Sequence, residues 1–152
     1  MSDEAAVPDR GANPSSARRL ADFYETLTPA SLATLDQYYA PDARFKDPFN
    51  EVAGVPAIRR IFEHMFATTE SPRFVVTDRI EQGAQAMLGW AFHFRLRGRA
   101  LTVRGVTHLR FDAEGRVTLH RDYWDAAEEL YEKLPLLGGA MRVIKRRLSA
   151  SG

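Results

Sequence analysis

The spacing of apolar residues changes near Pro72. Before this proline, apolar side chains recur at the three- and four-residue intervals of a helix. After it, four segments alternate apolar and polar residues, as strands do: 73–80, 86–97, 101–111 and 116–124. Helices followed by a run of strands indicate an α+β fold, in which the helices pack on one face of a curved antiparallel sheet.

Three helices are expected before Pro72. They begin after Ser15 or Ser16, after Pro29, and around Gly54 and Pro56, because these residue types favour helix starts. Their expected inward positions are Leu20, Phe23, Tyr24 and Leu27, then Leu32, Leu35 and Tyr39, then Ile58, Ile61, Phe62 and Met65. Two further helices are expected near the C-terminus, one capped by Asp125 and a last one containing Met141, Ile144 and Leu148.

Length and composition favour one globular domain. The 152 residues are enough for one core, and residues 1–14 are small and polar, which predicts a disordered tail ahead of a single domain at 15–152 with a C-terminal helical extension. A formal net charge of +1 gives no field that would recruit nucleic acid. No cysteine is present and no apolar run is long enough for a membrane span, so we expect a cytoplasmic protein.

The turn residues set an expected register for the last two strands. If 112–115 is a four-residue hairpin loop, Thr107 lies opposite His120 and Gly105 lies opposite Asp122. Glycine opposite Asp122 would leave open space there and favour a cavity. A tight turn at Gly98 would likewise place Trp90 beside Thr107.

One face of the expected sheet collects aromatic and polar residues. Side chains two apart share a face, so this face carries Trp90, Phe92, Phe94, Val103, Gly105, Thr107, Leu109, His120, Asp122 and Trp124. Large aromatics around a few polar groups are typical of a small-molecule pocket. The opposite face is basic. It is either a solvated surface or a homodimer interface centred on Val106, Leu119 and Tyr123.

The segment 38–49, YYAPDARFKDPF, carries the first candidate acid. Pro48 restricts Asp47 to extended backbone at a strand end, which suits a carboxylate that points into a pocket. The alternative is that Asp47 and Pro48 only turn the chain.

Asp47 is expected to be the principal proton-transfer group, with Asp122 and His120 as its polar partners. A carboxylate among aromatic side chains is suited to general acid or base catalysis. The alternatives are that Asp122 anchors a loop through hydrogen bonds and that His120 is a core residue. Tyr24 has the same alternative, because aromatics at helical spacing usually pack.

Histidines 64, 93, 108 and 120 lack metal-ligand spacing, so neither a metal nor another cofactor is expected.

Several stretches together resemble the nuclear transport factor 2-like superfamily. They are YAPDARFKDP, AGVPAIRRIF, LRFDAEGRV and the closing HRDYWD, within roughly residues 16 to 135. The superfamily includes ketosteroid isomerases, SnoaL-like polyketide cyclases, limonene epoxide hydrolases and scytalone dehydratases. The resemblance implies a cone-shaped α+β fold of the cystatin-like kind, but one fold carries many activities.

The resemblance to the isomerases also implies roles for individual residues. Their catalytic aspartate corresponds to Asp47, and aromatic pocket positions correspond to Trp90 and Trp124. Their oxyanion-hole tyrosine falls on Phe23 or Tyr24. Phe62 and Thr107 stand where those enzymes have a supporting tyrosine and a protonated aspartate, so most of the isomerase oxyanion hole is missing.

The sequence thus predicts a SnoaL-like pocket for a hydrophobic small molecule. One reading is a cofactor-free isomerase, cyclase or dehydratase that uses Asp47, Asp122 and His120 on a carbonyl-type substrate. The other is a non-catalytic binding or dimerisation module. The expected ligand contacts are Phe23, Tyr24, Phe62, Trp90, Phe92, Val103, Thr107 and Trp124.

Overall fold

The computed structural model describes residues 15–130. The helices are α1 (Ser16–Glu25), the 3₁₀ helix η1 (Ala30–Gln37), α2 (Val55–Thr68) and α3 (Ala126–Glu129). The strands are β1 (Tyr39–Lys46), β2 (Glu51–Ala53), β3 (Glu70–Gln82), β4 (Gln85–Leu96), β5 (Arg99–Phe111) and β6 (Val117–Tyr123). The expected N-terminal tail and the last helix lie outside the described residues.

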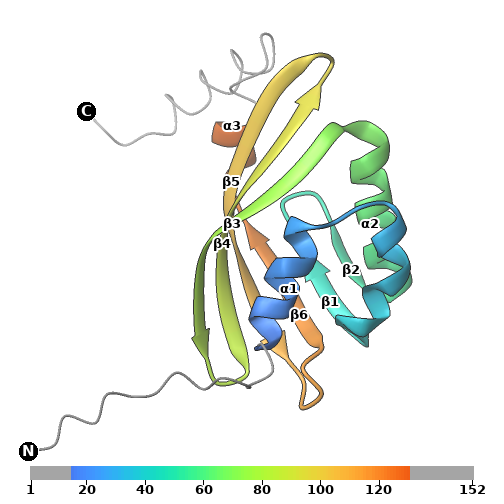
Figure 1. Ribbon diagram of the computed structural model, residues 1–152, viewed down its shortest axis with the longest axis vertical. Helices are drawn as coiled ribbons and strands as arrows, with labels where there is room; N and C mark the ends of the chain where they lie inside the picture. Colours follow the sequence, from blue (N-terminus) through green and yellow to red (C-terminus); the bar gives the residue numbers. More distant parts are fainter. Residues whose placement is uncertain (1–14, 131–152) are drawn as a thin grey trace, which may run out of the picture.

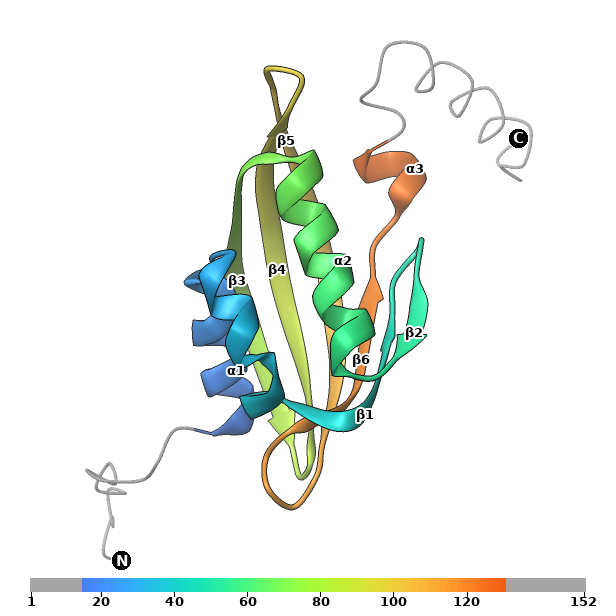
Figure 2. The ribbon, with the colours of Figure 1, turned by 90° about the vertical axis from the view of Figure 1, so that its right-hand side faces the viewer.

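The six strands form one curved sheet in the order β2-β1-β6-β5-β4-β3 (Figures 1 and 2). The expected α+β fold is confirmed. The sheet is mixed rather than wholly antiparallel, because β1 pairs in parallel with β6 and places Phe45 beside His120. Hairpin reasoning could not anticipate this pair, since the two strands are far apart in the sequence and no turn joins them. The short strand β2 was not anticipated either.

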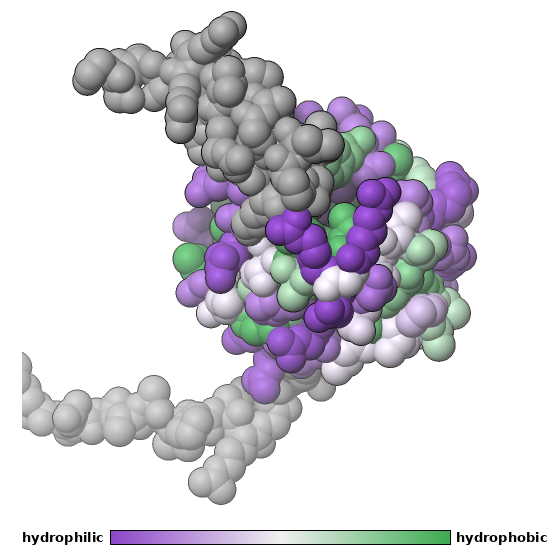
Figure 3. Space-filling model, turned by 90° about the horizontal axis from the view of Figure 1, so that it is seen from above, coloured by the Kyte–Doolittle hydropathy of each residue, from purple (hydrophilic) through white to green (hydrophobic). Residues whose placement is uncertain are grey.

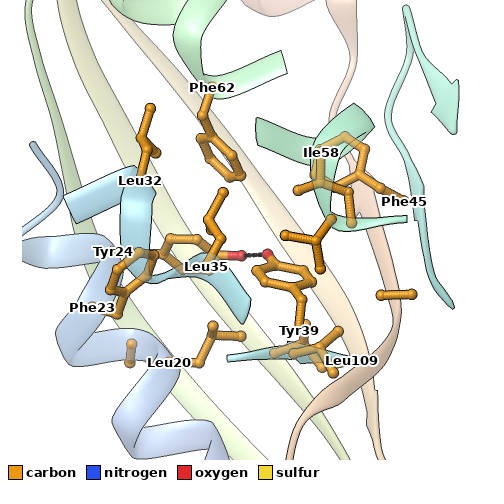
Figure 4. Close-up of a cluster of buried hydrophobic side chains, with 14 of the residues drawn as sticks. Leu20, Phe23, Tyr24, Leu32, Leu35, Tyr39, Phe45, Ile58, Phe62 and Leu109 are labelled. Carbon is orange, nitrogen blue, oxygen red and sulfur yellow. Dashed lines mark hydrogen bonds between the residues drawn. The ribbon is translucent and has the colours of Figure 1, made fainter. Parts of the chain in front are cut away.

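Helices α1 and α2 lie on the same face of the sheet (Figure 2). Ser15 caps α1 by accepting a hydrogen bond from the backbone N–H of Arg18. Five of the residues that helical spacing predicted are buried, Leu20, Phe23 and Tyr24 from α1 and Ile58 and Phe62 from α2. The predicted Ile61 and Met65 are partly buried. The five buried residues form the core with η1, β1 and residues of the sheet such as Leu109 (Figure 4).

The observed register differs by two residues from the expected one on both sides of β5. Thr107 lies opposite Asp122 and Leu88, and Trp90 lies opposite Gly105. Between β4 and β5, a two-residue turn at Arg97 and Gly98 has positive φ at both residues, a geometry that follows the twist of a hairpin.

The shift between β5 and β6 has a different cause. One residue of the shift comes from the loop, because Phe111 lies opposite Val117 and not opposite Arg116. The second comes from a bulge, because the next pair is Arg110 opposite Leu119, which makes Thr118 an extra residue in β6. A shift of two residues keeps every side chain on its expected face, because side chains alternate with a period of two. Thr107, His120 and Asp122 therefore share the inner face as predicted.

Among residues 15–130, no helix is long and apolar enough to cross a membrane.

Candidate functional site

A cavity of about 610 Å³ lies between α2 and the inner face of the sheet. Its walls are mostly aromatic and aliphatic, and Figure 3 shows hydrophobic residues among hydrophilic ones at the end of the molecule where the β4–β5 turn lies. Of the residues predicted for the site, ten line it: Tyr24, Asp47, Phe62, Trp90, Phe92, Val103, Thr107, His120, Asp122 and Trp124. Phe23 does not line it and instead stacks on Tyr38 in the core.

Asp122 is the centre of a directed hydrogen-bond network. Its Oδ1 accepts from the hydroxyl of Thr107 at 2.5 Å and lies 2.8 Å from Nε2 of His120. The indole N–H of Trp90 donates to Thr107 Oγ1 at 2.8 Å. Because an indole nitrogen can only donate, the threonine oxygen is its acceptor and the threonine proton is directed at Asp122.

Two buried phenols complete this network on the far side of His120. Nδ1 of His120 lies 2.9 Å from the hydroxyl of Tyr24 and 2.8 Å from that of Tyr39. The two hydroxyls also contact each other, as the dashed line in Figure 4 shows. Burial raises the pKa of Tyr24 and Tyr39 well above the ordinary value, and the Asp122 charge acts in the same direction. Both phenols therefore keep their protons and act as donors.

Counting protons assigns the tautomer of His120. An ionised Asp122 can only accept, so Nε2 carries a proton. When Nδ1 carries no proton, one tyrosine hydroxyl donates to Nδ1 and the second donates to the oxygen of the first. Both phenol protons are then used in hydrogen bonds. A proton on Nδ1 would leave one phenol without an acceptor. The network therefore favours a neutral His120 whose Nε2–H points at Asp122, with every donor directed toward that carboxylate.

The two oxygens of Asp122 differ in their surroundings. Oδ1 accepts both hydrogen bonds, whereas Oδ2 has no hydrogen-bond partner among the described residues. The side chain is 17% exposed and lines the cavity, while that of His120 is 3% exposed. His120 is held behind it by Phe45, whose ring centroid is 4.4 Å away. Asp122 thus presents one unpaired carboxylate oxygen in an apolar cavity.

Asp47 lies at the rim of the same cavity, directly after β1. Its Oδ1 accepts from the backbone N–H groups of Phe49 and Asn50, at 2.8 and 2.6 Å, and the Asn50 side-chain amide lies 3.1 and 3.2 Å from its two oxygens. These contacts close the turn between β1 and β2, as short polar side chains do in turns. Both carboxylate oxygens are therefore occupied within the turn.

Gly105 serves a different purpose from the open space that we expected. A Cβ atom there would lie 2.6 and 2.7 Å from carbons of the Trp90 indole and 3.0 Å from Cβ of Trp124. The space above the glycine is filled by the indole, which crosses it to reach Thr107 diagonally. Gly105 therefore positions Trp90 rather than enlarging the cavity.

Tyr39 is the one member of the network that sequence reasoning did not assign to the site. It was expected to point inward, and it is fully buried. Its contact with His120 depends on the parallel pairing of β1 and β6, for which the sequence carries no local signal. Within residues 15–130, no group of three or more His, Cys, Asp or Glu side chains is arranged as metal ligands would be.

Comparisons with known proteins agree with this architecture. Residues 20–120 match the SnoaL-like domain family. No curated protein sequence matches the chain significantly. Many solved structures share its fold, and three are described here.

A SnoaL-like polyketide cyclase candidate from Shewanella putrefaciens has a TM-score of 0.63 and 22% identity, over 78% of this chain and 98% of its own. An epoxide hydrolase of Mycobacterium tuberculosis, similar to limonene epoxide hydrolase, has a TM-score of 0.66 and 18% identity, over 85% and 96% of the two chains. A hypothetical protein of Catenulispora acidiphila with a ketosteroid isomerase-like fold, in complex with trimethylamine, has a TM-score of 0.65 and 20% identity, over 78% and 92% of the two chains.

Identities this low show the common fold and not a common activity. The family match covers most of the chain, including β1, α2, the strands β3 to β5 and the first part of β6. This chain therefore belongs to the SnoaL-like domain family and has the nuclear transport factor 2-like α+β fold.

Proposed function

We propose that this protein is an enzyme that moves protons on apolar carbonyl compounds, with Asp122 as the group that accepts and returns the proton. The observation that carries the proposal is the unpaired Oδ2 of Asp122 in a largely apolar cavity. A carboxylate oxygen in such a cavity has few solvent partners, so a substrate C–H or O–H group can approach it.

The proposed step breaks the C–H bond next to the substrate carbonyl. Its proton goes to Oδ2 of Asp122, and its electron pair becomes the π bond of an enolate whose charge lies on the carbonyl oxygen. Return of the proton to a different carbon gives an isomer. Attack of the enolate carbon on a second carbonyl closes a ring, and the resulting alkoxide takes the proton back from Oδ2. Expulsion of a β-hydroxyl group, which takes that proton and leaves as water, gives an unsaturated product.

The residues behind Asp122 are positioning residues in this proposal. Thr107 and His120 hold Oδ1 and so fix the direction of Oδ2, while Tyr24 and Tyr39 fix the tautomer of His120. Asp47 is assigned to the turn at the rim, because taking up a proton would require it to give up hydrogen bonds within that turn.

Deuterium exchange tests the proposal directly. The probe is 2-tetralone, an apolar ketone with acidic C–H groups, in D₂O, and proton NMR follows the loss of its signals next to the carbonyl. The protein should accelerate exchange, and Asp122→Asn should lower the acceleration at least about 100-fold. Calorimetry of both proteins with 2-tetralone shows whether the variant still binds. Full exchange activity in Asp122→Asn would contradict the proposal.

Non-catalytic binding is the second candidate, favoured by the apolar character of the cavity. Saturable binding of 2-tetralone without any acceleration of exchange would support this function instead.

We also propose that two copies pair through the outer face of the sheet. Four large hydrophobic residues of the sheet are exposed on that face, namely Ile80, Met87, Val106 and Tyr123. Contiguous apolar surface of this kind is typical of interfaces. Light scattering should give a dimer that Val106→Glu converts to a monomer. A monomeric parent protein at micromolar concentration would contradict the pairing.

A further inference from the structure

We propose that the ligand of this cavity carries an anionic group, such as a carboxylate, and that Arg60 binds this group at the rim while the apolar body fills the interior. The inference rests on the proposed function only in using the same cavity. It adds the chemical class of the ligand and names a residue that selects it.

Arg60 is the one lysine or arginine among the described residues that line the cavity. It makes no hydrogen bond or ion pair with any residue of the described range 15–130. Its neighbour Arg59 points elsewhere, because its Nε donates to the backbone oxygen of Leu32 at 3.1 Å. The two adjacent arginines of α2 thus differ in their contacts. Arg59 is hydrogen-bonded to Leu32, whereas the N–H groups of Arg60 have no acceptor among residues 15–130.

The acids of the cavity do not neutralise Arg60. Asp47 uses its carboxylate in the β1–β2 turn, and Asp122 uses Oδ1 in the network with Thr107 and His120. Glu51, in the nearby strand β2, pairs with Lys46 at 3.8 Å. Among residues 15–130 the guanidinium group therefore has no partner, so it can bind a group of the ligand, and its planar set of donors matches a carboxylate.

The cavity near Arg60 has a polar wall and an aromatic wall, which suit the two ends of an amphipathic ligand. His64 and Thr68 follow it at four-residue steps on α2 and also line the cavity, which makes one polar wall. Phe49 and Trp124 line the cavity too, with their rings 5.5 Å apart. An amphipathic acid, with its charged end at Arg60 and its apolar part against the aromatic side chains, satisfies both kinds of surface.

The expected preference for an anionic ligand over an uncharged one is moderate, because Arg60 is exposed and its charge is screened by water. A matched pair of probes measures it, 4-phenylbutanoate and its methyl ester, which differ in charge and have the same apolar body. Calorimetry should show that the protein binds the acid roughly three- to tenfold more tightly than the ester. The difference should shrink as salt is added.

Three variants test the assignment. Arg60→Gln should abolish the preference for the acid and leave the affinity for the ester within about twofold, whereas Arg60→Lys should keep part of the preference. Arg110→Gln removes the same charge from the outer face of the sheet and should change neither affinity. Equal affinities for acid and ester in the parent protein, or equal weakening of both by Arg60→Gln, would overturn the inference.

The outcomes separate this inference from the proton-transfer proposal. Asp122→Asn should keep the preference for the acid even though it loses exchange activity, so either result can fail alone. Absence of saturable binding for both probes would contradict the anionic-ligand inference without bearing on the fate of 2-tetralone.

Discussion

Asp47 and Asp122 line the same cavity, yet their surroundings differ in kind. The donors to Asp47 come from Phe49 and Asn50 in its own turn. The partners of Asp122 come from across the fold, with Thr107 on the neighbouring strand and, behind His120, phenols from α1 and β1. A local set of donors closes a turn, whereas a distant set orients one carboxylate oxygen and leaves the other unpaired. The environment, and not the residue type, distinguishes their roles.

The largest expected difference concerns stability. His120→Ala removes the acceptor of the buried phenols and one donor to Asp122, and it leaves a cavity, so it should lower the free energy of unfolding by roughly 2–4 kcal/mol. Asn50→Ala removes only the side-chain amide from Asp47, whose backbone donors remain, and should cost about 1 kcal/mol. Urea unfolding of both variants measures the difference. Equal costs would mean that the Asp122 network is no more integral to the fold than the turn.

Local patterns in the sequence predicted ten residues that line the cavity and were wrong about Phe23. Alternation along β5 and β6 placed Thr107, His120 and Asp122 on one face, and the two-residue error in register left this unchanged. Helical spacing likewise predicted that Tyr24 and Phe62 point inward.

The pairings within the cavity could not be predicted, because they depend on exact register and on contacts between distant segments. A loop one residue longer than expected and the extra Thr118 in β6 together move Asp122 opposite Thr107. The parallel pairing of β1 with β6 brings Tyr39 to His120. The Asp-Pro sequence at Asp47 predicted both a turn and a pocket acid, and the structure shows a turn at the rim of the pocket. The sequence ranked Asp47 ahead of Asp122 for proton transfer, whereas the proposed function reverses this order. The reversal depends on which carboxylate oxygens are already hydrogen-bonded, and the sequence does not show this.

A smaller effect is expected at the glycines of the sheet. Gly105→Ala places a Cβ within 2.7 Å of the Trp90 indole, which must then move away from Thr107. This change should lower the free energy of unfolding by about 1–3 kcal/mol. Gly89→Ala is the matched control in β4, where the nearest atom is a carboxylate oxygen of exposed Asp78 that can swing aside. Urea unfolding and near-ultraviolet circular dichroism should change markedly only for Gly105→Ala. A tryptophan signal that stays the same in both variants would show that Gly105 does not position Trp90.

The phenols behind Asp122 predict an alkaline limit to stability. Their pKa values are raised in the folded protein, so their contribution is fully present below the unfolded value near 10 and is lost as pH rises above it. Above that value, each phenol should lower the free energy of unfolding by roughly 1.4 kcal/mol per pH unit. Tyr39→Phe should reduce the slope, whereas exposed Tyr123→Phe and Asn50→Ala should not. Urea unfolding between about pH 9 and pH 11 measures the slope of the free energy of unfolding against pH. An unchanged slope in Tyr39→Phe would contradict the raised pKa of Tyr39.

The most direct test compares the two carboxylates under one assay. Asp122→Asn and Asp47→Asn each replace a cavity-lining acid by an amide of the same shape, and deuterium exchange of 2-tetralone is measured for both. The unpaired oxygen of Asp122 predicts that the first variant loses exchange activity at least about 100-fold. The second should keep it within about threefold, once both proteins are shown to be folded. Loss of exchange in Asp47→Asn with full activity in Asp122→Asn would contradict the account and assign the proton transfer to the rim.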